Sequence, residues 1–400
     1  MSHPRLDLAS MLMCVDTLFA TASSEERKYW GFLLFQRVIH DAPVEFIPGL
    51  FTQNLVRCLM NQLSSPKRFL HRAAGKTTKS IIGRAASEPE SRIPILKALL
   101  TAPYGDINFD RITKTKTVET LLSHSNHSDF KQLTAFFGEL LLRPGSQDEK
   151  DAVSRRLVAA DQIVSTVRNM HLESTDSGRH PSGTFLIKGI LDLFSKCAYF
   201  DLETLPNTNP GRPSPPISQS TRNIFRTRIS SCIAYLVAKA IDSADFSCNL
   251  IRTIQDGDEH AGFGTPLLEA DDTVRQVITR AWEILDEAES RSKAESSKSS
   301  KANYYRSVKL LYSLTILQVY NEDLDAVGML GELNDCFEGL LHKKSTGKGS
   351  ATLVEILLSF ASRPSQLFRR LAQQVFTACA PDVDETGLQS MVKVADPSFR

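Results

Sequence analysis

The chain has 400 residues, of which 42% are hydrophobic, 8% aromatic and 23% charged. This composition is typical of a packed globular protein and excludes a chain that is disordered throughout. The 47 Lys and Arg residues nearly balance the 46 Asp and Glu residues, so the net charge of +1 gives no overall electrostatic case for a polyanionic partner.

Membrane and secretion signals are weak. The longest apolar runs, such as residues 233–238, are far shorter than the roughly 20 residues that a membrane span needs. Asp7 and Asp16 interrupt the apolar start of the chain, which argues against a signal peptide. The seven cysteines are far apart and form no Cys-x-x-Cys pair, so we expect neither a disulfide framework nor a thiolate zinc site. An intracellular, reducing compartment and no membrane partner are expected.

The first predicted helix covers residues 24–40. Ser23 and Glu26 form a capping-box pattern at its start, because a hydroxyl and a carboxylate can satisfy the free amides of the first turn. Its apolar residues are predicted to form one wide buried face: Trp30, Phe32, Leu33, Leu34, Phe35 and Val38.

Two further helices are predicted next. Leu55, Leu59 and Leu63 recur at every fourth position and predict a helix over residues 51–63. Ser65 and Pro66 are predicted to open a third helix, because proline loses no hydrogen bond at the first helical position. Helical spacing continues along the chain, and no run of alternating polar and apolar residues predicts a strand.

Residues 64–87 carry only basic charge. If the third helix starts at Pro66, then Arg68, Arg72, Lys76 and Lys79 share one of its faces. The opposite face is predicted to pack inward through Phe69, Leu70, Ala73 and Ile81. A basic face of this kind is typical of phosphate-backbone binding, and a solvated helix face, with or without acidic neighbours, is the alternative. With a second basic cluster, the predicted nucleic-acid-binding residues are Lys67, Arg68, Arg72, Lys76, Lys79, Arg111, Lys114 and Lys116.

The pattern as a whole predicts an all-α protein. About fifteen helices of roughly 12 to 25 residues are expected, with pairs about 40 residues apart, which is the period of HEAT and armadillo arrays. The predicted fold is therefore a HEAT/armadillo-like α-solenoid of antiparallel helix pairs, and a closed helical bundle is the alternative.

Three stretches interrupt the helical pattern and are predicted to be insertions in loops. Residues 173–183 are polar, residues 205–219 contain five prolines, and residues 290–301 are rich in Ser and Lys. The predicted segments are N-terminal helical repeats (1–204), a Pro-rich loop (205–219), middle repeats (220–289), a linker (290–301) and C-terminal repeats (302–400).

One short motif suggests an enzyme. Residues 104–108 (YGDIN) resemble a tyrosine-glycine-aspartate motif of family B polymerases, which ends in a second aspartate because two carboxylates hold the metal ions. Here the second position is Asn108, a neutral and poorer magnesium ligand. We therefore predict a turn between helices and no polymerase site.

Other catalytic patterns are incomplete. Gly347 and Lys348 resemble the end of a phosphate-binding loop, but His342 replaces its first glycine. His124 and His127 have no further ligand nearby in the sequence and are predicted to lie in a surface loop. No G-x-S-x-G motif occurs. We expect no catalytic residue, metal, cofactor or small-molecule substrate.

Several longer blocks together resemble one family. They lie at residues 24–37, 51–63, 68–74, 109–119 and 353–376, in order and with the variable stretches between them. They are similar to blocks of the nucleolar DNA polymerase V or polymerase phi family, which includes the Myb-binding protein of animals.

The resemblance implies a nucleolar HEAT/armadillo-like scaffold in rDNA transcription and ribosome biogenesis. Ribosomal DNA, pre-ribosomal RNA, and nucleolar or transcription proteins are the expected partners. Two alternatives stay open: a DNA polymerase, as the family name suggests, and a purely protein-binding helical scaffold. Because family members are much longer, we expect this chain to be an interior or truncated portion.

Overall fold

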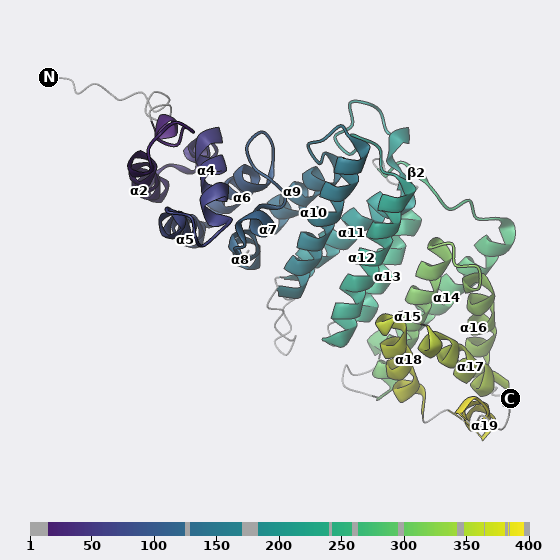
Figure 1. Ribbon diagram of the computed structural model, residues 1–400. Helices are drawn as coiled ribbons and strands as arrows, with labels where there is room; N and C mark the ends of the chain where they lie inside the picture. Colours follow the sequence, from purple (N-terminus) through teal and green to yellow (C-terminus); the bar gives the residue numbers. More distant parts are fainter. Residues whose placement is uncertain are drawn as a thin grey trace. The chain divides into compact units, whose positions relative to one another are not determined.

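A computed structural model describes most of the chain and confirms the all-α prediction (Figure 1). The described residues are 15–124, 129–169, 183–239, 242–257, 263–294, 300–341, 348–363, 365–380, 383 and 385–395. The strands within these ranges are β1 (Phe200–Asp201) and β2 (Thr265–Pro266), which pair antiparallel.

The chain divides into two compact units. Unit 1 comprises Met1–Leu193 and Pro213–Thr221, and unit 2 comprises Phe194–Arg212 and Arg222–Arg400. The five segments predicted from composition stay a prediction.

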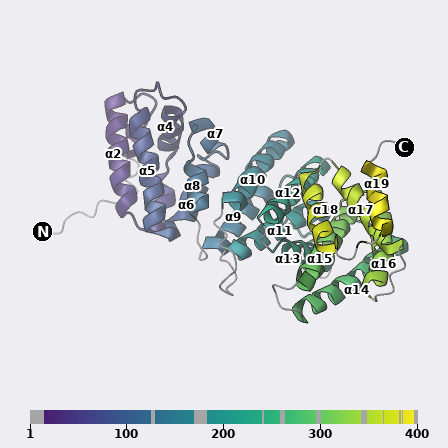
Figure 2. The ribbon, with the colours of Figure 1, turned by 90° about the horizontal axis from the view of Figure 1, so that it is seen from below.

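Unit 1 contains helices of very different length. They are α2 (Glu25–Asp41), α3 (Ile47–Leu50), α4 (Gln53–Leu63), α5 (His71–Ser87), α6 (Arg92–Leu100), α7 (Phe109–Thr113), α8 (Thr117–Ser123), α9 (Phe130–Leu142), α10 (Glu149–Asn169) and the first part of α11 (Gly183–Tyr199). Helices α3, α7 and α8 are shorter than predicted. Helices α2 and α5 lie side by side although α3 and α4 separate them in the sequence (Figure 2).

Helix α2 buries a narrower face than predicted. Phe32, Phe35 and Ile39 are buried, and Phe32 packs edge-on against Phe19 at a ring-centroid distance of 5.1 Å. The predicted burial is wrong for Trp30, Leu33 and Leu34, which are exposed. The segment is apolar on both sides, and only the side toward Phe19 and α5 is covered, so apolar spacing alone could not identify the inner face.

The start of α2 also differs from the predicted capping box. The N-cap is Ser24, whose side chain accepts a hydrogen bond from the Arg27 amide at 3.4 Å. The Ser23 hydroxyl instead donates to the Thr17 carbonyl at 2.8 Å. Helix α4, by contrast, buries Leu55, Leu59 and Leu63 as predicted.

Unit 2 is built around one central helix. It contains the end of α11, most of α12 (Gln219–Ala238), α13 (Ser243–Asp256), α14 (Asp272–Ala294), α15 (Ser300–Tyr320), α16 (Ala326–Leu341), α17 (Lys348–Ser362), α18 (Gln366–Cys379) and α19 (Glu385–Ala395). Helix α15 contacts α13, α14, α16 and α18, and every residue from position 307 to 319 is buried. A helix buried on all sides is typical of the core of a bundle.

The Pro-rich stretch at residues 205–219 is irregular up to residue 218, as its prolines predict, and residues 213–217 of it are anchored on the rest of unit 1. The buried Arg156 guanidinium donates to the carbonyls of Leu141 at 2.9 Å and Pro216 at 2.8 Å, and also to that of Pro215. The Ser214 amide donates to the Leu142 carbonyl at 2.8 Å. The backbone groups of residues 214–216 have no partners within a helix, and these hydrogen bonds to α9 and α10 satisfy them instead.

The other two predicted insertions are described only in part. Helix α14 extends to Ala294 and α15 begins at Ser300, so both ends of the stretch at residues 290–301 are helical rather than irregular. Residues 295–299 and 173–182 lie outside the described residues.

Two further sequence expectations can be compared with the described residues. None of the described helices is long and apolar enough to cross a membrane. The cysteines in these ranges are buried and form no disulfide with one another, namely Cys58, Cys197, Cys232, Cys248, Cys336 and Cys379.

Candidate nucleic-acid interface

The turn between α4 and α5 shapes the basic region. Residues 65–70 do not form the first turn of a helix, and α5 begins at His71, so the predicted helix start at Pro66 is wrong. The buried Gln62 side chain accepts a hydrogen bond from the Leu70 amide at 3.1 Å, and the Gln62 carbonyl lies 3.1 Å from His71 Nδ1. Through these contacts, the end of α4 holds residues 65–70 in a fixed turn.

Helix α5 separates its charged face from its packed face. Arg72, Lys76 and Lys79 are exposed at helical spacing. On the packed face, Ala74 and Ile81 are fully buried, and the Thr77 hydroxyl accepts a hydrogen bond from Gln36 of α2 at 3.0 Å. The sequence therefore predicted the solvent face of α5 correctly for these three cations. Lys67 and Arg68 are also exposed but belong to the preceding turn, so Arg68 does not share the helix face.

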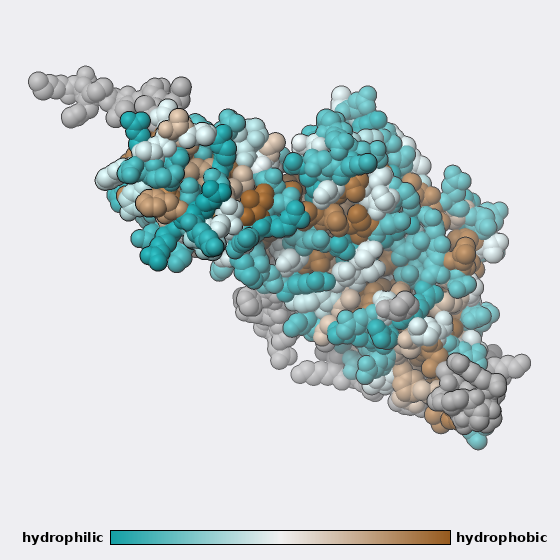
Figure 3. All heavy atoms as spheres, in the orientation of Figure 1, coloured by the Kyte–Doolittle hydropathy of each residue, from teal (hydrophilic) through white to brown (hydrophobic). Residues whose placement is uncertain are grey.

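We call these five residues, Lys67, Arg68, Arg72, Lys76 and Lys79, the α5 basic surface. None of them makes an ion pair with a described residue. The surface around α5 is mostly hydrophilic, with a few apolar side chains among the polar ones (Figure 3). No acidic neighbour pairs with these cations in the described part of the chain, and their exposure fits both the binding prediction and the alternative of a solvated helix face.

Arg84, the remaining cation of residues 64–87, is used internally. Its guanidinium pairs with Glu88 and donates to the carbonyls of His40 and Ala42, each at 2.7 Å. It therefore holds the end of α2 against α5, and its charge is already compensated. Because its charge is paired, Arg84 has a structural role and is not counted with the unpaired cations of the α5 basic surface.

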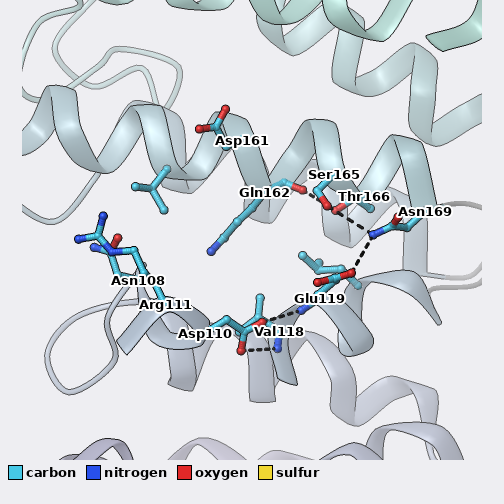
Figure 4. Close-up of a pocket in the computed structure, with 12 residues that line it drawn as sticks. Asn108, Asp110, Arg111, Val118, Glu119, Asp161, Gln162, Ser165, Thr166 and Asn169 are labelled. Carbon is cyan, nitrogen blue, oxygen red and sulfur yellow. Dashed lines mark hydrogen bonds between the residues drawn. The ribbon is translucent and has the colours of Figure 1, made fainter. Parts of the chain in front are cut away.

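The second predicted cluster, Arg111, Lys114 and Lys116, lies where α7 connects to α8. All three side chains are exposed, and Lys116 forms an ion pair with Glu119 at 3.3 Å. Arg111 lines a pocket of about 380 Å³ together with Asp110, Glu119 and Asp161 (Figure 4). This cluster is thus mixed in charge, and it is a weaker candidate for phosphate contacts than the α5 basic surface.

Asp110 has a structural role in this pocket. Its carboxylate accepts hydrogen bonds from the Val118 amide at 3.1 Å and the Glu119 amide at 3.0 Å, at the start of α8 (Figure 4). Burial raises the pKa of Asp110, and these hydrogen bonds oppose that shift because they favour the ionised form. The carboxylate caps a helix, as expected at an N-terminus.

The polymerase-like residues 104–108 form a loop between α6 and α7, which confirms the predicted turn. Asp106 accepts a hydrogen bond from the Asn108 amide at 2.8 Å, and the Gly105 amide donates to the Thr101 carbonyl at 2.9 Å. A family B motif requires a β-hairpin, whereas here the aspartate closes a turn next to a helix end.

The other enzyme-like patterns gain no support from the described residues. No group of three or more His, Cys, Asp and Glu side chains within them could hold a metal ion. His124 is exposed, with Nδ1 2.8 Å from the Thr120 carbonyl. His127 and Gly347 lie outside the described residues.

Two features were missed in the sequence. Phe69, predicted to pack inward, is 82% exposed within the α5 basic surface. In unit 2, a pocket of about 820 Å³ is lined by residues of α12, α13, α15 and α18, including the charged Asp245, Arg306 and Arg370. Residues so distant in sequence carry no local pattern that could have predicted the pocket.

Fold and surface together define an all-α protein whose α5 carries an exposed and unpaired basic face. The chain belongs to the DNA polymerase phi family, because the model of that family matches residues 12–398. The resemblance noted in the sequence blocks is thus confirmed.

Two yeast relatives are similar over almost the whole chain. The rDNA transcriptional regulator pol5 of Schizosaccharomyces pombe is 27% identical over 399 residues, covering 94% of this chain and 39% of the relative. The rDNA transcriptional regulator POL5 of Saccharomyces cerevisiae is 26% identical over 400 residues, covering 96% of this chain and 35% of the relative. The chain thus spans well under half the length of either yeast protein.

A vertebrate relative is similar over a shorter stretch. A Myb-binding protein 1A-like protein of Danio rerio is 30% identical over 128 residues, which are 30% of this chain and 10% of the relative. No solved structure is a significant match to the chain.

Proposed function

We propose that this chain is part of a nuclear, nucleolar helical scaffold that regulates rDNA transcription and takes part in ribosome biogenesis. Its α5 basic surface would bind ribosomal DNA or pre-ribosomal RNA, and nucleolar or transcription proteins would be further partners. The observation that carries the binding proposal is the set of exposed cations on α5 that have no ion-pair partner among the described residues. The names of the two yeast relatives support the role in rDNA transcription.

The spacing of the cations suits a phosphate backbone. Arg72 and Lys79 are seven positions apart on α5, which corresponds to about 10 Å along a helix axis. That length covers about three base steps of one DNA strand. Contacts of this kind position a nucleic acid and release counterions but do not read its sequence.

The two alternatives have less support. A polymerase would need convergent carboxylates, whereas Asp106 closes a turn, and both yeast relatives carry the name of a regulator. A purely protein-binding scaffold predicts that partners are captured equally well after nuclease treatment, whereas the binding proposal predicts that some are lost. The HEAT/armadillo-like solenoid of antiparallel pairs also stays a proposal. In unit 1 it is supported by contacts between helices close in sequence, such as α4 with α5 and α9 with α10.

The test is to neutralise the exposed face of α5. In the variant Arg72→Gln/Lys76→Gln/Lys79→Gln, we expect weaker binding to labelled duplex DNA and RNA in fluorescence anisotropy. The slope of log affinity against log salt should become shallower by up to about 0.9 for each lost phosphate contact on DNA.

A matched control removes the same charge from α14. Arg275, Arg280 and Lys293 are exposed, and each pairs with an acid of its own helix. Their replacement by Gln should leave affinity and salt slope close to those of the wild type. Unchanged binding of the α5 variant at low salt would contradict the proposal.

A further inference from the structure

An exposed aromatic ring lies within the α5 basic surface. Phe69 follows Lys67 and Arg68 directly and precedes Arg72 by three positions. Its 82% exposure is the largest of any aromatic residue among the exposed hydrophobic side chains of the described ranges. The flanking cations have no acidic partner in those ranges.

The structure of the turn explains why the ring faces outward. Leu70 is buried, and its amide donates to the side chain of Gln62. The backbone is closed by hydrogen bonds from the Arg68 amide to the Ser65 carbonyl and from the His71 amide to the Arg68 carbonyl, each at 3.1 Å. With Leu70 fixed in the core, its neighbour Phe69 is held on the solvent side.

Phe69 differs from the other large exposed apolar group in unit 1. Trp30, Leu33 and Leu34 share one side of α2, but the charge of that helix is mixed, with Glu25, Glu26 and Asp41 beside Arg27, Lys28 and Arg37. Nothing in the structure shows what covers this side of α2. The surroundings of Phe69 contain cations and no acid from residue 64 to residue 87, so they favour a polyanion that also has aromatic groups.

We propose that Phe69 is a stacking platform for an unpaired base, and that the α5 basic surface binds single-stranded nucleic acid in preference to duplex. This inference deepens the proposed function and rests on it. Bases of a duplex are stacked on one another, whereas bases of a single strand can turn toward an aromatic ring. Lys67, Arg68 and Arg72 would contact the phosphates on either side of the stacked base.

The test compares variants of Phe69 on three labelled ligands of equal length: single-stranded RNA, single-stranded DNA and duplex DNA. For Phe69→Ala and Phe69→Leu we expect about tenfold weaker binding to both single strands, the range typical of losing one base–aromatic stack. Duplex binding should change less than twofold, and the salt slope should stay constant because no charge is removed. Phe69→Trp should retain binding.

Two controls make the result interpretable. The melting temperatures of these variants should match the wild type, because the side chain is exposed. The indole emission that Phe69→Trp adds to the wild-type signal should be quenched by single-stranded ligand, which reports direct contact with the bases.

The outcomes separate this inference from the proposed function. In one outcome, Phe69→Ala binds all three ligands like the wild type while the α5 triple variant binds them more weakly. That result would contradict the stacking role of Phe69 and leave the proposed binding by the α5 basic surface supported. If the triple variant is also unchanged, the proposed function itself is wrong. Equal losses on single strands and duplex would overturn the preference for single strands. A greater loss on RNA than on DNA would support the inference and identify RNA as the ligand.

Discussion

Gly105 occupies a position where no side chain fits. A Cβ atom there would lie 2.6 Å from the carbonyl carbon of Leu99 and 2.7 Å from the carbonyl oxygen of Ala98. These are backbone atoms at the end of α6, so they cannot move aside as a flexible side chain could. The loop that contains the polymerase-like residues is therefore shaped by close packing on a helix end.

We expect Gly105→Ala to lower the free energy of unfolding by about 1 to 3 kcal/mol, which is the usual effect of forcing an extra carbon into a packed site. Urea denaturation followed by circular dichroism measures the change.

The matched control is Gly83→Ala on α5, where a Cβ atom would meet nothing within 4 Å. Within a helix this change should raise the free energy of unfolding by about 0.5 to 1 kcal/mol. Effects of the same sign in both variants would contradict the packing explanation.

Among the elements, the Pro-rich stretch is held in part by one buried arginine. Arg156 of α10 is 1% exposed and donates to backbone carbonyls of α9 and of residues 215 and 216. Hydrogen bonds from a charged donor typically contribute about 1.5 to 3 kcal/mol each. We expect Arg156→Leu to lower the free energy of unfolding by at least about 3 kcal/mol, because it leaves buried carbonyls without donors.

The measurement is urea denaturation together with limited proteolysis of the folded protein. Faster cleavage within residues 205–219 is expected in Arg156→Leu. The control is Arg155→Leu. Among the described residues the Arg155 side chain pairs only with Asp151 of the same helix, and it should contribute less than about 1 kcal/mol. Equal stability of the two variants would show that the arginine does not hold the loop.

The elements also show which sequence signals are reliable. Leu55, Leu59 and Leu63 were predicted correctly because one helix face alone is apolar. The burial of Trp30 was wrongly predicted because α2 is apolar on two sides and tertiary contacts choose between them. Pro66 was wrongly predicted to open a helix, since Gln62 and Leu70 fix a turn that the proline pattern does not reveal.

At the scale of the whole molecule, periodicity predicted the all-α class, because apolar residues recur at helical spacing through most of the chain. The division into two units was not predictable in the same way, because residues 213–221 join unit 1 through contacts with residues far away in the sequence. The candidate site shows the same limit. The positions of Arg72, Lys76 and Lys79 follow from the sequence, whereas their lack of partners and the exposure of Phe69 depend on packing.

The net charge of +1 gives no reason to expect binding of a polyanion. The local arrangement of the charges should therefore determine whether a polyanion binds, and a charge-balanced variant tests this. The triple variant Arg72→Gln/Lys76→Gln/Lys79→Gln can be combined with Asp272→Asn/Glu283→Gln/Glu287→Gln on α14. Asp272 and Glu283 are exposed and Glu287 is half-buried, and all three pair with arginines of their own helix, so their loss should affect stability little.

The combined variant has the net charge of the wild type but lacks the cations of α5. If local charge governs binding, it should elute from heparin at the same low salt concentration as the triple variant. If net charge governs binding, it should elute with the wild type, and the α5 basic surface would lose its proposed role. We expect the first result, because a bound sulfate or phosphate group interacts mainly with the cations that it contacts, and charges beyond the Debye length of about 8 Å at physiological salt are largely screened from it.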